Sequence, residues 1–159
     1  MKIRTIYIAI IAFALALNCK AQNEDIKTID KFIKNVILND DFDFTETHNY
    51  LKIPKDSLKG NTESLRLLKN KCNFYSTFLK NREYKILPFS EAKKLGLTKN
   101  SDIDYNNTKE IYLLLVDDAR ITTFLVQNNK ILSFFTGNGR TLLIKSKSYG
   151  GNPKKPYFF

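Results

Sequence analysis

The stretch Ile111–Thr136, IYLLLVDDARITTFLVQNNKILSFFT, decides the fold that we expect for this chain. Its first six residues are apolar at every position, which is typical of a strand covered on both faces of a sheet. Asp117–Arg120 predicts a turn, and Asn128 with Asn129 predicts another, because asparagine tolerates a positive φ. Connections this short exclude helical crossovers and predict an antiparallel meander of Ile111–Val116, Ile121–Gln127 and Lys130–Thr136.

Further short strands are expected on either side of this stretch. EYKILP, Glu83–Pro88, is one, and Thr141–Lys147 is another, because it follows turn-forming glycines at 137 and 139. Between them, Ser90–Leu95 predicts a short helix that ends at Gly96. The sheet should therefore contain four to five strands.

Two amphipathic helices are expected before the sheet. Apolar residues recur at steps of three and four from Glu24 to Leu38, and the polar residues that follow end the helix. A second helix should begin near Gly60–Thr62, where Asn61 or Thr62 can cap it, and run to about Lys80. Its apolar stripe consists of Leu65, Leu68, Cys72, Tyr75 and Leu79. The predicted fold is α+β, with two amphipathic helices packed on an antiparallel meander.

This order of elements is similar to that of the cystatin-like and nuclear-transport-factor-like folds, in which a sheet curls round a helix. No motif of either family covers any stretch of the chain, so the resemblance is an analogy of fold alone. Separately from this resemblance, we expect the protein to act through its surface or through a pocket between sheet and helices, rather than by covalent chemistry.

The N-terminus predicts export. Lys2 and Arg4 precede the apolar run Ile6–Leu17, which is shorter than the ~20 residues of a membrane-spanning helix. Cys19-Lys20-Ala21 resembles a cleavage site and would make residues 1–21 a signal peptide. Alternatively, residues 1–18 are a lipoprotein signal and Cys19 is lipidated, although Asn18 fits poorly before such a cysteine. We favour simple cleavage.

Either cleavage leaves one globular domain, residues 22–159, with a flexible C-terminal tail at 148–159. The protein is expected to be periplasmic or secreted, or else lipid-anchored in the cell envelope. Lysine outnumbers arginine 21 to 5, which suggests an AT-rich genome and is compatible with a bacterial source.

Cys72 and an acidic cluster are the first candidate sites. Cys72 lies on the apolar stripe, so we expect a buried hydrophobe rather than a nucleophile paired with His48. The run DDFDFTETH, residues 40–48, offers carboxylates and one imidazole to a divalent cation, but it lacks the central glycine of an EF-hand loop. We favour an exposed acidic loop with Phe42 and Phe44 turned inward, and expect no metal or cofactor. If the protein is an enzyme, the candidate acids or bases are Asp43, His48 and Asp118.

Charge is distributed unevenly along the chain. The full sequence carries +10, and removal of Lys2, Arg4 and Lys20 with the leader leaves +7. Residues 119–159 contain seven basic residues and no acidic one. Such a surface attracts an anionic ligand or an acidic protein. The predicted binding residues are Arg120, Lys130, Arg140, Lys145 and Lys147.

These features favour an exported cell-envelope protein that acts as a non-enzymatic binding or accessory module with a basic C-terminal surface. Export makes nucleic acid an improbable partner, and membrane contact is expected only through lipidated Cys19. Two alternatives stay open: a small pocket enzyme of the nuclear-transport-factor-like type, and an inhibitor or immunity-type partner of one protein.

Overall fold

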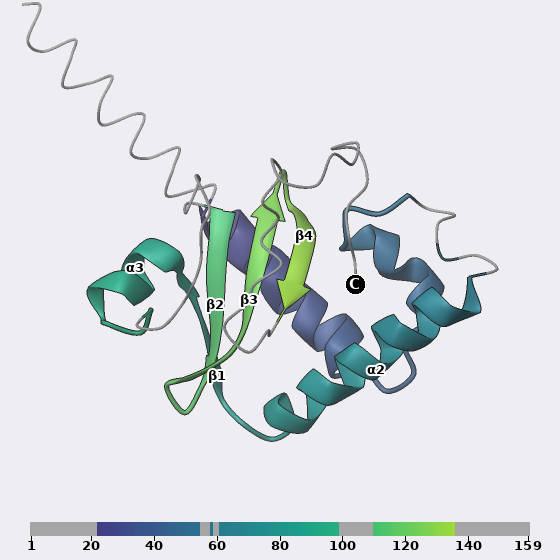
Figure 1. Ribbon diagram of the computed structural model, residues 1–159, viewed down its shortest axis with the longest axis horizontal. Helices are drawn as coiled ribbons and strands as arrows, with labels where there is room; N and C mark the ends of the chain where they lie inside the picture. The colour runs from purple at the N-terminus through teal and green to yellow at the C-terminus, as the bar shows by residue number, and fades with distance from the viewer. Residues whose placement is uncertain (1–21, 55–57, 59–60, 99–109, 136–159) are drawn as a thin grey trace, which may run out of the picture.

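The computed structural model describes residues 22–54, 58, 61–98 and 110–135. Within these residues, helices cover both faces of a four-stranded antiparallel sheet with the strand order β1-β2-β3-β4 (Figure 1). The predicted α+β meander is therefore confirmed. The strands are β1 (Tyr84–Pro88), β2 (Ile111–Val116), β3 (Ala119–Gln127) and β4 (Lys130–Phe135).

Two-residue turns with a left-handed backbone join the last three strands. Asp117 and Asp118 have φ values of 50° and 59°, and Asn128 and Asn129 have values of 53° and 56°. Consecutive positive φ angles match the twist of a two-residue hairpin. The asparagine turn was predicted. The aspartate turn is tighter than predicted, because the two aspartates alone reverse the chain and Arg120 belongs to β3.

The first helix comprises residues 22–32 and continues as the π-helical turn η1 (Ile33–Ile37). It agrees with the predicted helix Glu24–Leu38, and its apolar face is buried as expected. The second helix, α2 (Thr62–Leu79), begins at the predicted cap: the Asn61 side chain accepts a hydrogen bond from the backbone N–H of Ser64 at 3.1 Å.

Alternate residues of β2 enter two separate cores. Tyr112, Leu114 and Val116 pack in the larger core, beneath the first helix and α2. Ile111, Leu113 and Leu115 face the opposite side and pack with Ala92 of α3 (Phe89–Lys94). All six residues are buried, which confirms the prediction of a strand covered on both faces.

The short helix α3 ends as the sequence predicted. Gly96 has a φ of 73°, a left-handed conformation that glycine adopts without steric cost. The predicted strand Thr141–Lys147, the tail 148–159 and the leader lie outside the described residues. No helix in the described part of the chain is long and apolar enough to cross a membrane.

Candidate ligand-binding site

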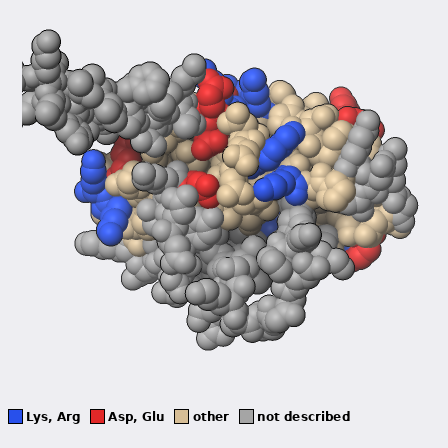
Figure 2. Space-filling view, turned by 90° about the horizontal axis from the view of Figure 1, so that it is seen from above, with Lys and Arg blue, Asp and Glu red and all other residues tan. Residues whose placement is uncertain are grey.

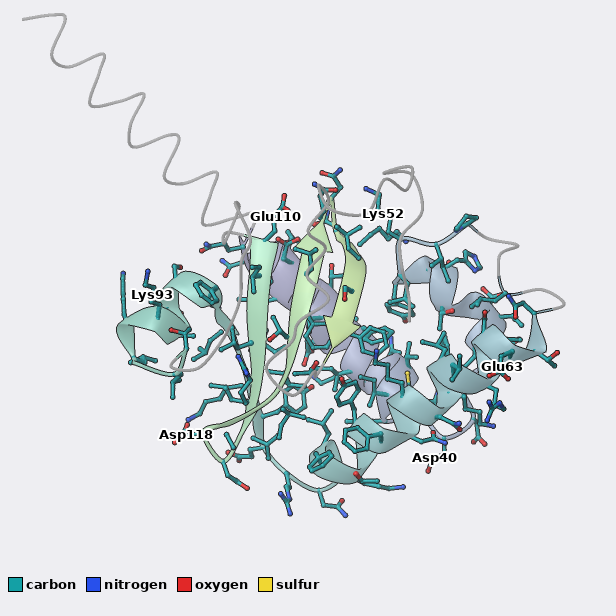
Figure 3. All side chains as sticks on the ribbon, viewed as in Figure 1. Asp40, Lys52, Glu63, Lys93, Glu110 and Asp118 are labelled. Carbon is teal, nitrogen blue, oxygen red and sulfur yellow. The ribbon has the colours of Figure 1, made fainter. Side chains whose placement is uncertain are left out.

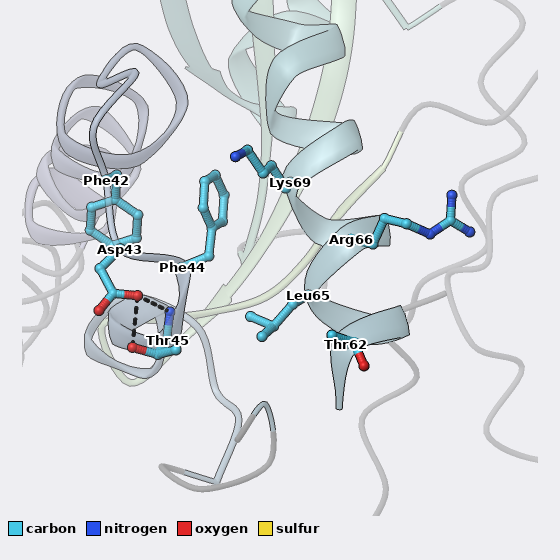
Figure 4. Close-up of a pocket in the computed structure, with 8 residues that line it drawn as sticks. All are labelled: Phe42, Asp43, Phe44, Thr45, Thr62, Leu65, Arg66 and Lys69. Carbon is cyan, nitrogen blue, oxygen red and sulfur yellow. Dashed lines mark hydrogen bonds between the residues drawn. The ribbon is translucent and has the colours of Figure 1, made fainter. Parts of the chain in front are cut away.

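An open hollow of about 400 Å³ lies between the chain that enters η2 (Phe44–Asn49) and the N-terminal half of α2 (Figure 4). Two segments that are distant in sequence form its walls. Small-molecule sites typically have volumes of ~300 to 1,000 Å³. The lining residues are Phe42, Asp43, Phe44, Thr45, Thr62, Leu65, Arg66 and Lys69.

Phe42 and Phe44 form an apolar wall of the hollow. Their rings meet edge to face with centroids 5.5 Å apart. The ring of Phe42 also packs edge to face on that of Tyr50, with a centroid distance of 6.3 Å. Tyr50 is held in turn by Asn35 of the first helix, whose amide donates to the Tyr50 hydroxyl at 2.9 Å. Both phenylalanines pack against the main core, as predicted, yet each keeps part of its ring exposed. The wall is therefore supported by the core and only half-buried.

Asp43 lies beside the two phenylalanines, on the side away from Lys69, and adds a polar group to the wall (Figure 4). As the N-cap of η2, its carboxylate accepts hydrogen bonds from the Thr45 backbone N–H at 2.9 Å and the Thr45 hydroxyl at 2.8 Å. The backbone bond, followed by the hydroxyl bond, lowers the pKa of Asp43. Asp43 consequently stays ionised at neutral pH and is a poor proton donor.

The two basic residues that line the hollow differ in how they are engaged. Arg66 donates two hydrogen bonds to Glu63, from Nε at 2.9 Å and from Nη2 at 2.7 Å. Figure 4 shows the Arg66 guanidinium pointing away from Phe44, whereas Lys69 extends toward the side on which Phe44 lies. Lys69 is exposed and has no hydrogen-bond or ion-pair partner among the described residues. Lys69 therefore supplies the available positive charge.

The three candidate acid or base residues are not brought together. His48 lies within η2, where its Nδ1 donates to the Thr45 carbonyl at 3.1 Å, and it does not line the hollow. Asp118 belongs to the β2–β3 turn and forms an ion pair with Lys85 at 3.3 Å. Figure 3 shows Asp118 at the end of the sheet remote from Lys52, whose side chain bonds to Gln127. Of the three residues, only Asp43 lines the hollow.

The predicted basic residues that the structure describes are also separated. Lys130 donates hydrogen bonds to the backbone carbonyls of His48, at 3.2 Å, and of Asn49. Arg120 is exposed at the other end of β3, about 23 Å away along a strand that rises ~3.3 Å per residue. Figure 2 shows acidic and basic side chains interspersed on the upper face. Arg140, Lys145, Lys147 and Cys19 lie outside the described residues.

The acidic cluster and Cys72 have structural surroundings of their own. Asp40 forms an ion pair with Lys80 at 3.1 Å, and no group of three or more metal-binding side chains occurs in the described ranges. Cys72 is only 1% exposed, as the apolar stripe predicted, and burial raises the pKa of its thiol to about 12. At neutral pH the thiol is protonated and therefore a weak nucleophile.

The α2 side of the hollow was not predicted from the sequence. Leu65 and Arg66 lie three and four residues after Thr62, and Lys69 lies four and three residues after them, so all four line one flank of the helix. That spacing was visible in the sequence, but nothing indicated that residues 42–45 would face it.

Comparisons with protein-family models, with curated proteins and with solved structures found no match. The similarity to cystatin-like and nuclear-transport-factor-like folds thus rests on the order of elements alone.

Proposed function

We propose that this protein is an exported, non-enzymatic binding module of a bacterial cell envelope, and that it engages an anionic partner at the hollow. The observation that carries the proposal is the position of Lys69. Its ammonium borders the apolar wall of Phe42 and Phe44 and has no partner among the described residues. An accessible cation beside an apolar wall attracts an anion and offers contact area to the apolar part of the same partner.

The arrangement of ionisable groups favours binding over catalysis. General acid–base chemistry needs a proton donor or acceptor positioned beside the reacting group. Asp43 is already engaged with Thr45, and Asp118 lies at the far end of the sheet. Besides Asp43, the ionisable residues that line the hollow are Arg66 and Lys69, and both are cations at neutral pH rather than proton acceptors.

Export is the second part of the proposal, and it rests on the basic start and the apolar run before Cys19. Mass spectrometry of the protein purified from its own cells will test it. A mature chain that begins at Gln22 supports a signal peptide, and a diacylated or triacylated Cys19 supports a lipoprotein. An intact chain that begins at Met1 would contradict export.

Binding to an anion is tested by retention on poly-glutamate resin in a salt gradient. Lys69→Glu should elute at clearly lower salt than Lys93→Glu, although both variants change the net charge equally. Lys93 lies on α3, on the other side of the molecule from the α2 residue Glu63 (Figure 3). Equal elution of the two variants would remove Lys69 from the binding surface. The same resin will show whether Arg140→Glu with Lys145→Glu, in the predicted basic segment, weakens retention further.

A further inference from the structure

We infer that the hollow selects a small aromatic monocarboxylate, an inference that rests on the proposed binding function and specifies its ligand. Three observations support it: two half-buried aromatic side chains, one available cation, and a carboxylate that is turned away from that cation. Each observation restricts the ligand in a different way.

The apolar wall determines which kind of apolar group the ligand should carry. Phe42 and Phe44 meet edge to face at 5.5 Å, and Leu65 faces them from α2 (Figure 4). Aromatic rings prefer further rings in offset or edge-to-face contact, so a planar aromatic ligand is favoured over a flexible chain. Support from Tyr50 lowers the cost of ordering this wall when a ligand binds.

The charges set the number and position of anionic groups. Arg66 is already bonded by the Glu63 carboxylate, so the ligand's negative charge should lie at Lys69. Asp43 keeps its own negative charge at the other end of Phe44, with its carboxylate directed to Thr45 (Figure 4). A second anionic group on the ligand would approach Asp43 and be repelled, because like charges brought close together oppose binding. One carboxylate is therefore favoured over two.

The size of the hollow favours a small molecule over a polymer or a membrane surface. A volume of about 400 Å³ accommodates one or two fused rings. Lys69 and the two phenylalanines of the wall line the same open hollow, so one small ligand can contact all three side chains. Membranes of anionic lipid are nevertheless included in the test, because they also combine apolar and anionic groups.

The test is titration of the mature protein with 2-naphthoate, followed by amide chemical shifts of ¹⁵N-labelled protein. We expect saturable shifts in residues 42–45 and 62–69. Binding of 2-naphthalenemethanol, acetate or 2,6-naphthalenedicarboxylate should be weaker by about tenfold or more. The alcohol lacks the carboxylate, acetate lacks the rings, and the dicarboxylate adds a second anionic group that Asp43 repels. Vesicles containing phosphatidylglycerol should leave these amides unshifted.

Matched variants separate the ligand from general effects on folding. Lys69→Met and Phe44→Leu should each weaken 2-naphthoate binding, whereas Lys93→Met and Phe74→Leu should not. Phe74 is 52% exposed on α2 and does not line the hollow. Thermal melts of all four variants will identify any that fail to fold, and the comparison among the four small molecules on the unmodified protein stands without them.

Two results would overturn the inference. If 2-naphthalenemethanol binds as tightly as 2-naphthoate, the hollow recognises apolar surface without charge. If vesicles shift the amides of the hollow and 2-naphthoate does not, the ligand is a lipid surface. A Lys69-dependent retention on poly-glutamate, with no naphthoate binding, would leave the proposed function intact and remove only the small-molecule ligand. Retention independent of Lys69 would remove the proposed function.

Discussion

The interface between the first helix and the sheet differs from the hollow beside α2 in how completely its groups are satisfied. Phe32, at the end of the first helix, is 0% exposed, and its ring centroid lies 6.3 Å from that of Phe124 and 5.0 Å from that of Phe134. The polar groups there are paired across elements: Tyr112 donates to Asp25 at 2.8 Å and Tyr84 donates to Asp30 at 2.7 Å.

The hollow also contains aromatic and charged residues, but they are less buried and less fully paired. Phe42 and Phe44 are half-buried, and Lys69 has no partner in the described part of the chain. Groups whose contacts are already made stabilise the fold, and groups with remaining contact capacity can bind a partner. The comparison therefore assigns stability to the helix–sheet interface and recognition to the hollow. The following variants test that division, in order of decreasing expected effect.

Phe32→Ala should be the most destabilising change. The ring is fully enclosed, so its removal loses apolar burial and leaves a cavity, at a cost of about 3 to 5 kcal/mol. Phe74→Ala on α2 should cost about 0.5 kcal/mol, because half of that ring is already in water. Urea unfolding followed by circular dichroism measures both values. If Phe74→Ala lowered the free energy of unfolding as much as Phe32→Ala, the outer flank of α2 would also be part of the packed core.

Tyr112→Phe tests the polar part of the same interface. The ring should still fit, but Asp25 would lose its donor at a partly buried position, and a cost of about 1 to 3 kcal/mol is expected. Tyr112→Phe combined with Asp25→Ala should cost less than the sum of the single changes, because the unpaired carboxylate is removed with its partner. Strict additivity in urea unfolding would mean that the hydrogen bond does not hold the first helix to the sheet.

Periodicity and turn chemistry predicted most of the fold. The burial of β2 on both faces followed from six consecutive apolar residues, and the turn at Asn128 followed from the backbone preference of asparagine. The error at Asp117–Arg120 arose because aspartate also adopts a positive φ, so two residues sufficed.

The candidate site was much less predictable. Residues 42–45 and 62–69 meet only through tertiary packing. Hydrophobic periodicity predicts which face of one helix or strand is buried, but not which other element that face will meet. The sequence also drew attention to charge in the C-terminal segment, whereas Lys130 is engaged with backbone carbonyls near η2. Net charge in a segment does not reveal which cations are already paired.

The two aspartates of the first helix provide the smallest and most specific test. Burial opposes ionisation of Asp30, but hydrogen bonds from Lys34 and Tyr84 outweigh it and lower its pKa below the ordinary value of 3.8. Burial, with a contribution from Glu110, raises the pKa of Asp25 above that value despite the bond from Tyr112. Ionised Asp30 therefore stabilises the folded state above pH 3.8, and this contribution is lost as the pH falls through its lowered pKa. Ionised Asp25 has the opposite effect, because the folded state holds its proton more tightly than the unfolded state does.

Asp30→Asn and Asp25→Asn should consequently show opposite pH dependence. As the pH rises from about 2 to 6, unfolding free energies relative to the unmodified protein should decrease for Asp30→Asn and increase for Asp25→Asn. Urea unfolding at closely spaced pH values measures both curves, and the changes should be smaller than the loss in Phe32→Ala because both carboxylates retain contact with water. Parallel curves would mean that the two Tyr–Asp contacts are electrostatically equivalent. The interface beneath the first helix would then be distinguished from the hollow by its apolar packing alone.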